Sequence, residues 1–204
     1  MEDRRVVVTG IGLITPLGNN TEDSWQALRE GKNGIRPWSM PDFDGVDVHV
    51  AAEVRNFNPE DYLSRKEVRR MDRVMHFSVV SSQEAMREAG LNEDNFDHDR
   101  MGVICATGIG GIASIEEQVK RGYCQGFNRI SPFFVPLAIT NIVASQISMY
   151  HKLHGPCYTL NTACAAGTDA VGHAYRLIKS GTMDLMLAGG AEAALTKMGV
   201  GGFA

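Results

Sequence analysis

The sequence predicts an α/β fold, in which short buried strands alternate with longer amphipathic helices. Three stretches rich in apolar residues have the length of strands, at residues 5–9, 101–106 and 183–187. Runs of this kind are typical of strands that are buried on both faces of a sheet. Between them, apolar residues recur at helical spacing, most regularly over residues 64–89. We therefore expect helices packed against a buried sheet.

The composition is that of a soluble globular protein. The chain has 204 residues, of which 44% are hydrophobic and 22% charged, enough for one large domain or one and a half. A net charge of −4 argues against general nucleic-acid binding. There is no signal peptide and no apolar run of membrane-spanning length, so we expect an untargeted protein with no membrane partner. The four cysteines form no C-x-x-C pair, which predicts a reducing cytoplasm and neither disulfides nor a metal site.

The first predicted strand, residues 5–9, leads into Gly10 and Gly12, a pair that also occurs in dinucleotide-binding turns. Thr15 and Pro16 stand where that motif needs its third glycine and a continuing helix. A glycine turn at the end of a central strand is therefore the preferred interpretation.

A short helix follows this turn. Asn20 or Thr21 is its expected N-cap, and Trp25 and Leu28 are its expected apolar contacts. Residues 32–58 are rich in turn formers and predict irregular structure.

A long helix is predicted from Ser64 to Gly90. It begins with a capping box, Ser64-Arg-Lys-Glu67. Its first turns carry five basic residues, although positive charge there opposes the helix dipole. These residues form either a solvated face or a docking surface for an acidic partner. They are Arg65, Lys66, Arg69, Arg70 and Arg73.

The strand at residues 101–106 leads into a second glycine-rich loop. Gly108, Gly110 and Ala113 match the pattern G-x-G-x-x-A, but the acidic residue expected about 20 positions later is missing. We therefore discount a nicotinamide site. We expect these glycines to let the backbone pass close to an active site.

Residues 122–136 form a predicted loop with two adjacent phenylalanines, Phe133 and Phe134, between prolines. These side chains suggest a pocket wall or a contact between subunits. The alternative is that they only anchor the loop to the rest of the fold. Pro136 then begins a helix that is expected to run to about Lys152.

Cys164 is the candidate reactive residue, between a predicted strand at residues 158–160 and a predicted helix at residues 165–180. At a helix N-terminus the free N–H groups and the macrodipole favour an anion, so this thiol should ionise more readily than a free one. A thiolate beside N–H donors suits acyl transfer, in which an oxyanion forms. The alternative is a buried cysteine that only packs. Residues 183–187 then predict a strand, and the glycine-rich end, residues 198–204, shows no capping element.

Six motifs occur in order along the chain: Val6-Val-Val-Thr-Gly-Ile-Gly12, Ser64-Arg-Lys-Glu67, Ser131-Pro-Phe-Phe-Val-Pro136, Thr162-Ala-Cys164, Ala188-Gly-Gly-Ala-Glu192 and Gly199-Val-Gly-Gly-Phe203. Together they resemble the type II β-ketoacyl-[acyl-carrier-protein] synthases of fatty-acid biosynthesis. The resemblance implies a thiolase-like fold with α-β-α-β-α layers. Residues 1–204 would be the N-terminal half-domain, with the C-terminal half absent from this chain. It also implies a cytoplasmic homodimer that needs no cofactor.

The reaction implied by the resemblance is 3-oxoacyl-[acyl-carrier-protein] synthesis. Cys164 would take an acyl group from an acyl carrier protein thioester. Malonyl carrier protein would then bind and lose carbon dioxide, and the resulting carbanion would attack the acyl-enzyme in a Claisen condensation.

The resemblance also assigns roles residue by residue. Cys164 would be the nucleophile, and its own N–H would supply half of the oxyanion hole. A second group would line the acyl pocket, with Phe134 reaching in from the partner subunit: Ile109, Phe134, Ala163, Gly199 and Phe203. A third group would receive the acidic carrier protein: Lys66, Arg69, Arg70 and Arg129.

Two features depart from the family pattern. Ala165 and Ala166 follow the cysteine, where many relatives have a hydroxyl residue, and none of the six histidines lies in a motif that matches the family's catalytic histidines. We therefore expect residues 1–204 alone to be an incomplete enzyme, poorly soluble and without condensing activity. The alternatives are a polyketide-type ketosynthase or other thiolase-fold acyltransferase, a chain-length-factor-like partner and a nucleotide-binding dehydrogenase.

Overall fold

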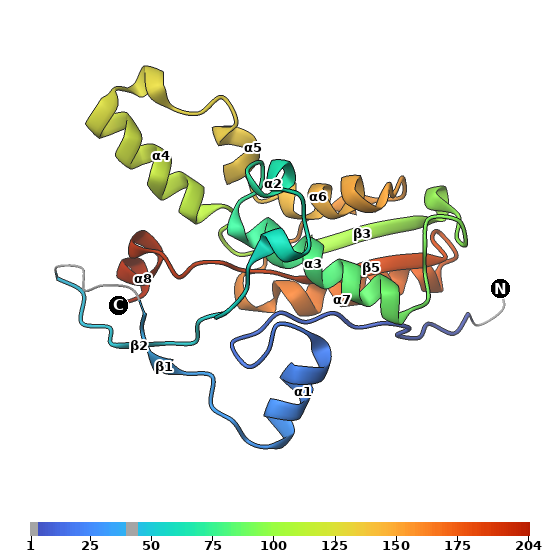
Figure 1. The fold of residues 1–204 in the computed structure, drawn as a ribbon. Helices are drawn as coiled ribbons and strands as arrows, with labels where there is room; N and C mark the ends of the chain where they lie inside the picture. Colours follow the sequence, from blue (N-terminus) through green and yellow to red (C-terminus); the bar gives the residue numbers. More distant parts are fainter. Residues whose placement is uncertain (1–3, 40–44) are drawn as a thin grey trace.

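A computed structural model of the chain describes residues 4–39 and 45–204 (Figure 1). Helices surround a small parallel sheet, as the predicted α/β class requires. The α-helices are α1 Thr21–Arg29, α2 Arg65–Val68, α3 Arg73–Glu88, α4 Ile112–Gln125, α5 Phe134–Ala138, α6 Ile142–His151, α7 Ala166–Lys179 and α8 Lys197–Phe203. The 3-10 helices are η1 Pro59–Asp61, η2 His98–Arg100, η3 Phe127–Arg129 and η4 Ala163–Ala165. The strands are β1 Arg36–Pro37, β2 Val50–Ala51, β3 Met101–Ala106, β4 Cys157–Tyr158 and β5 Leu185–Gly190.

The strand β3 is the centre of the fold. It pairs in parallel with β4 on one edge and β5 on the other, in the order β4-β3-β5. The register aligns Met101 with Leu185 and Ala106 with Gly190, so β3 and β5 end together. All six residues of β3 are buried, which confirms the predicted strand at residues 101–106.

Two helix layers cover β3, and its side chains alternate between them. Val103 and Cys105 belong to a core shared with α3 and α6, whereas Ile104 and Ala106 belong to a second core shared with α7. Figure 1 shows α6 above the sheet and α7 below it.

The inner face of α7 is made of small residues. Ala166, Ala170 and Ala174 recur every fourth position and are all buried. Where this helix begins, a Cβ added to Gly190 would lie 3.4 Å from the Gly167 Cα, so helix and strand approach closely.

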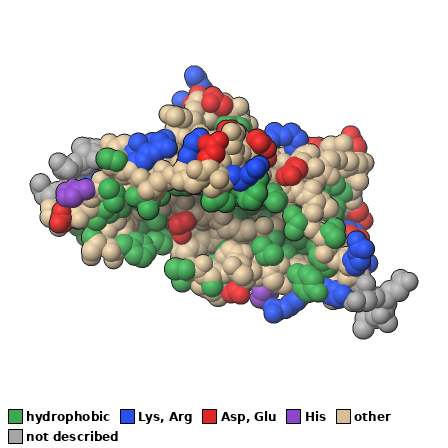
Figure 2. Space-filling view, turned by 90° about the horizontal axis from the view of Figure 1, so that it is seen from below, with side chains coloured by type: hydrophobic (Ala, Val, Ile, Leu, Met, Phe, Trp, Pro, Cys, Tyr) green, Lys and Arg blue, Asp and Glu red, His purple; other side chains and the backbone are tan. Residues whose placement is uncertain are grey.

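Other apolar faces are open to solvent. Val171 and Tyr175 on α7 are about half exposed, at 53% and 49%. In the view from below, hydrophobic side chains gather around a hollow on this face (Figure 2).

The strand predicted at residues 5–9 is wrong, because this segment pairs with no strand. Val7 and Val8 are 62% and 78% exposed. The chain instead runs along α3, where the Ile11 N–H donates to the Glu88 carboxylate at 2.6 Å and a Cβ on Gly12 would lie only 1.8 Å from the Ser81 carbonyl oxygen. Gly12 therefore serves a close approach to a helix, and not a nucleotide.

The helix α1 begins where the sequence predicts, since the Asn20 side chain accepts from the Asp23 N–H. Its predicted apolar contacts are wrong: Trp25 and Leu28 are exposed, and Ser24 and Ala27 are buried instead. A hydrogen bond explains which face is buried: the Ser24 hydroxyl donates to the Gly18 carbonyl and turns that face of α1 inward.

The helix predicted from Ser64 to Gly90 is two helices. The capping box at Ser64 and Glu67 is confirmed, but α2 ends at Val68. Asp72 then caps α3 through the Val74 N–H, and its other carboxylate oxygen accepts from the Ser114 N–H at 2.9 Å and hydroxyl at 2.6 Å. One buried carboxylate thus joins the starts of α3 and α4.

After residue 136, the observed bounds of helices and strands also differ from the predicted ones. The helix expected from Pro136 is split into α5 and α6, and β4 occupies Cys157–Tyr158 rather than residues 158–160. The last strand starts at Leu185 and not at residue 183. The C-terminal segment does have a cap, because the Thr196 hydroxyl accepts from the Gly199 N–H and begins α8. No helix within residues 4–39 and 45–204 has both the length and the apolar character to cross a membrane.

His151, at the end of α6, is held between helices. Its Nε2 lies 2.8 Å from the Ser82 hydroxyl on α3. Burial lowers the pKa of this imidazole from 6.5 to about 4, because the charged form would be desolvated.

We expect this histidine to make stability depend on pH. Between pH 6.5 and about 4 the unfolded chain binds a proton at His151 that the folded chain does not, so stability falls as the pH falls through this window. The loss is at most about 3 kcal/mol, at roughly 1.4 kcal/mol per pH unit. Urea unfolding of the intact protein at several pH values measures it. His151→Gln should reduce this slope, with the remainder including His76, whose pKa burial also lowers. His154→Gln, at an exposed position, should keep the slope. An unchanged slope in His151→Gln would contradict the assignment.

Candidate active site

Cys164 is the middle residue of η4, which leads directly into α7. It is exposed, so the alternative that it only packs in the core is wrong. The preceding Ala163 has φ +50°, a left-handed backbone conformation that residues other than glycine rarely adopt. Such a backbone persists only where its surroundings hold it, and it turns the cysteine out of the strand-to-helix connection.

Side chains on both sides hold this turn. The Asn161 amide donates to the Thr107 carbonyl at 2.6 Å, and so fixes the turn to the end of β3. The Thr162 hydroxyl donates to the Asp169 carboxylate at 2.6 Å. Because Asp169 lies in the first turn of α7, its charge is also favourable there. Cys164 therefore sits on a braced turn at a helix N-terminus.

The glycine loop after β3 also approaches this end of the sheet. Gly110 has φ +76°, and a Cβ on Gly111 would lie 1.8 Å from the Leu137 carbonyl oxygen, so the loop passes close to the α5 helix. The Glu192 carboxylate accepts from the Gly108 N–H at 2.8 Å and the Ile109 N–H at 3.1 Å. The N–H groups of Gly108 and Ile109 are therefore already bonded to a side chain of the same chain.

The proposed pocket residues do not all lie together. Ile109 and Phe134 are partly buried, at the glycine loop and at the start of α5. Gly199 is buried in α8, and Phe203 at its end is 81% exposed.

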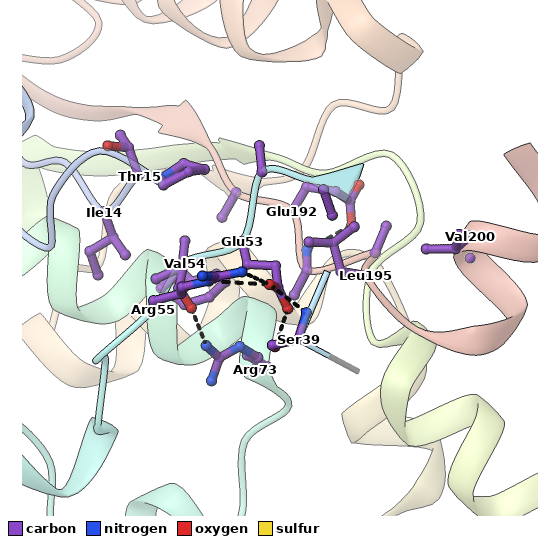
Figure 3. Close-up of a pocket in the computed structure, with 18 of the residues that line it drawn as sticks. Ile14, Thr15, Ser39, Glu53, Val54, Arg55, Arg73, Glu192, Leu195 and Val200 are labelled. Carbon is purple, nitrogen blue, oxygen red and sulfur yellow. Dashed lines mark hydrogen bonds and ion pairs between the residues drawn. The ribbon is translucent and has the colours of Figure 1, made fainter. Parts of the chain in front are cut away.

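A cavity of about 1180 Å³ opens between residues 48–56, the segment after β5, and α8 (Figure 3). Gly199 and Phe203 line it, but Cys164 is not among the described residues that do. The structure therefore brings the α8 residues together with this cavity and leaves Ile109, Phe134 and Ala163 outside its lining.

Sequence reasoning missed a polar cluster on the wall of this cavity (Figure 3). Glu53 accepts from the Ser39 hydroxyl at 2.6 Å and pairs with Arg55 at 2.6 Å. Arg73 donates to the Val54 carbonyl at 3.2 Å and lies 4.8 Å from the centre of the Phe77 ring. The cluster joins Ser39 and residues 53–55, which follow β1 and β2, to α3. No local sequence motif predicts this contact between distant segments.

The basic residues are exposed, as a docking surface requires. Lys66 lies within α2, and Arg69 and Arg70 follow its last residue. The Arg70 guanidinium lies 5.9 Å from the centre of the Phe133 ring. Arg129 lies in η3, directly after the C-terminal end of α4. The first three therefore form one patch, which reaches the loop that carries Phe133 and Phe134.

The four cysteines are all free and differ in environment. Burial raises the pKa of the Cys105 thiol to about 12, so it stays protonated and unreactive. Cys124, Cys157 and Cys164 are exposed. In the described part of the chain, no three His, Cys, Asp or Glu side chains gather as a metal site would need.

The parallel sheet between helix layers, with a cysteine at the helix N-terminus, defines a protein of the thiolase-like class. Comparison with known proteins agrees: a crystal structure of a β-ketoacyl synthase from Burkholderia phymatum superposes with a TM-score of 0.84 at 31% identity, over 97% of this chain and 48% of that one. The ishigamide ketosynthase/chain length factor superposes with a TM-score of 0.91 at 28% identity, over 98% of this chain and 50% of that one.

The chain belongs to the β-ketoacyl synthase family, since residues 3–204 match the family described as "Beta-ketoacyl synthase, N-terminal domain". It is 41% identical to 3-oxoacyl-[acyl-carrier-protein] synthase 2 of Coxiella burnetii and 42% identical to the protein of that name from Synechocystis sp., in each case over the whole chain. The chain spans about half the length of these curated relatives, 49% of each.

Proposed function

We propose that the protein is a 3-oxoacyl-[acyl-carrier-protein] synthase of fatty-acid elongation, with Cys164 as its nucleophile. The observation that carries the proposal is the exposed Cys164 on a braced turn before α7. The identity of about 40% to curated synthases of that name, over the whole chain, supports it.

In the first stage the Cys164 sulfur attacks the carbonyl carbon of an acyl thioester. A tetrahedral oxyanion forms and collapses, the carrier thiol leaves, and the acyl group remains on sulfur. The N–H of Cys164 lies in the first turn before α7, where backbone donors are free to stabilise that oxyanion.

In the second stage a malonyl thioester loses carbon dioxide, and the resulting carbanion attacks the carbonyl carbon of the acyl group on Cys164. The carbon–sulfur bond to Cys164 then breaks, which releases the 3-oxoacyl thioester and returns the cysteine as a thiolate. Donors that stabilise the developing enolate are needed at this point. Several of the histidines contact groups away from Cys164, for example His76 with the Val68 carbonyl and His151 with Ser82. We propose that residues outside this chain supply these donors, and that residues 1–204 form the N-terminal half-domain.

A polyketide-type ketosynthase is the second candidate, because the ishigamide ketosynthase/chain length factor superposes closely. A chain-length-factor role is disfavoured by the accessible Cys164. The higher identity to fatty-acid synthases favours elongation.

We further propose that acyl carrier protein docks on the patch of Lys66, Arg69 and Arg70, with Arg129 at its margin. The acyl chain would be lined by Ile109, Phe134, Ala163, Gly199 and Phe203. A cytoplasmic location is proposed because all four thiols are free.

Cys164→Ser should abolish condensation, because a serine hydroxyl is a far weaker nucleophile at neutral pH. Product formation from acyl and malonyl carrier proteins is assayed, and mass spectrometry identifies the acylated residue. Cys124→Ser, at an exposed cysteine on α4, should leave activity unchanged. Acylation of Cys105, Cys124 or Cys157 in place of Cys164 would overturn the assignment.

Charge reversal at Lys66 or Arg69 should raise the KM for carrier protein about fivefold and leave kcat unchanged. Exposed charge pairs contribute up to about 1 kcal/mol and act mainly on encounter. The effect should shrink as salt is added. Arg29→Glu, an equal charge change on α1, is the control; a KM unchanged at both low and moderate salt would count against the docking surface.

We also propose a homodimer. Phe133 and Val135 are 52% and 58% exposed, and β4 is an edge strand whose outer hydrogen bonds are unpaired within the sheet. The intact protein should sediment as a dimer at micromolar concentration, and Phe133→Asp with Val135→Asp should shift it toward monomer. Sedimentation of the unchanged protein as a monomer would refute the proposal.

A further inference from the structure

Glu192 is the charged residue of the motif Ala188-Gly-Gly-Ala-Glu192. It has no role in the acylation step or in the carrier-protein docking proposed above. It leaves the sheet directly after β5. The Ala191 N–H donates to the Ala106 carbonyl at 2.9 Å, which holds the start of this segment against the end of β3. Because β3 and β5 are parallel and end in register, Glu192 faces the glycine loop that follows β3.

The Glu192 carboxylate binds that loop through one oxygen. Its Oε2 accepts from the Gly108 N–H at 2.8 Å and the Ile109 N–H at 3.1 Å, with the Thr107 hydroxyl at 3.4 Å. Successive N–H groups that converge on one point form a nest that favours an anion. The next N–H along the loop, that of Gly110, donates instead to the Thr107 hydroxyl at 3.2 Å.

The loop is therefore held from two sides. Asn161, three residues before Cys164, donates to the Thr107 carbonyl, and Glu192 accepts from the next two N–H groups. Asn161 thus ties the start of the loop to the cysteine turn, and Glu192 ties Gly108 and Ile109 to the segment after β5.

The segment that carries Glu192 is itself anchored. It leads to α8, where Glu116 on α4 accepts from the Met198 N–H at 2.9 Å and Thr196 caps the Gly199 N–H at 3.1 Å. Glu192 thus connects the loop of Ile109 to the segment that positions Gly199.

We propose that Glu192 is a positioning residue that fixes the backbone of Ile109 between the Cys164 turn and α8, and so determines which acyl chains the enzyme accepts. The inference rests on the proposed function. Glu192 and Gly108 are exposed, so water can replace the carboxylate at the two N–H groups. Removing the carboxylate should therefore change the loop more than the stability of the fold.

The test compares Glu192→Ala with Glu192→Gln in the intact enzyme. The glutamine retains an amide oxygen that can accept from both N–H groups, whereas alanine has none. One readout is kcat/KM for carrier proteins that bear a short or a long saturated acyl chain, with the KM for malonyl carrier protein as an internal reference. The other is amide hydrogen exchange in the peptide that contains residues 107–111.

In Glu192→Ala we expect the ratio of kcat/KM between long and short chains to change by roughly tenfold, the value of a charged hydrogen bond, with the malonyl KM unchanged. Exchange at Gly108 and Ile109 should accelerate. In Glu192→Gln the neutral amide oxygen can still accept from both N–H groups but binds them more weakly, so both readouts should change about threefold, clearly less than in Glu192→Ala. Glu117→Ala, which removes an exposed partner of Arg121 on α4, is the matched control and should change neither.

Equal losses for both chain lengths, or exchange at residues 107–111 that is the same with and without the carboxylate, would overturn the proposal. If the enzyme without any substitution forms no 3-oxoacyl product, that result would instead refute the proposed function. The exchange measurement would then still decide whether Glu192 holds the loop.

Discussion

The complete burial of β3 is the constraint on which the rest of the structure depends. A strand buried on both faces and paired on both edges leaves no backbone group for water, so its N–H and carbonyl groups bond to β4, to β5 and to residues beside these strands, such as Pro156 and Ala191. Its alternating side chains then require an apolar layer on each side. The helices α3 and α6 supply one with large side chains such as Met75 and Val79, and α7 supplies the other with alanines. Burial of each such large side chain contributes about 1.5–3 kcal/mol.

The candidate site follows from the way this sheet ends. Parallel strands finish at the same edge, so the loops after β3 and β5 and the turn before α7 meet there. Each is tied to another by a side chain that bonds to backbone: Asn161 to Thr107, and Glu192 to Gly108 and Ile109. A nucleophile needs this kind of support, because a loop that moves by an ångström loses the alignment that acyl transfer requires.

Environment separates thiols of equal intrinsic chemistry. Cys105 lies inside β3, where desolvation raises its pKa to about 12, while Cys164 lies exposed at a helix N-terminus. The two residues are alike in sequence context, since each stands between apolar or small neighbours. Their different exposure comes from the layer in which each is placed.

The sequence alone determined the α/β class, the central strand at residues 101–106, the helix after Cys164 and the caps at Asn20 and Ser64, because these depend on local periodicity and on side chains that bond to their own turn. The family motifs also singled out Cys164. Tertiary structure decided the rest. Residues 5–9 have a strand's composition, yet Val7 and Val8 are exposed, since the segment runs toward α3 and pairs with neither edge strand of the sheet. The long helix after Ser64 breaks because Asp72 bonds to Ser114, which is distant in sequence. The contact of Glu192 with the glycine loop exists only because β3 and β5 lie side by side in register, a juxtaposition that no local pattern encodes.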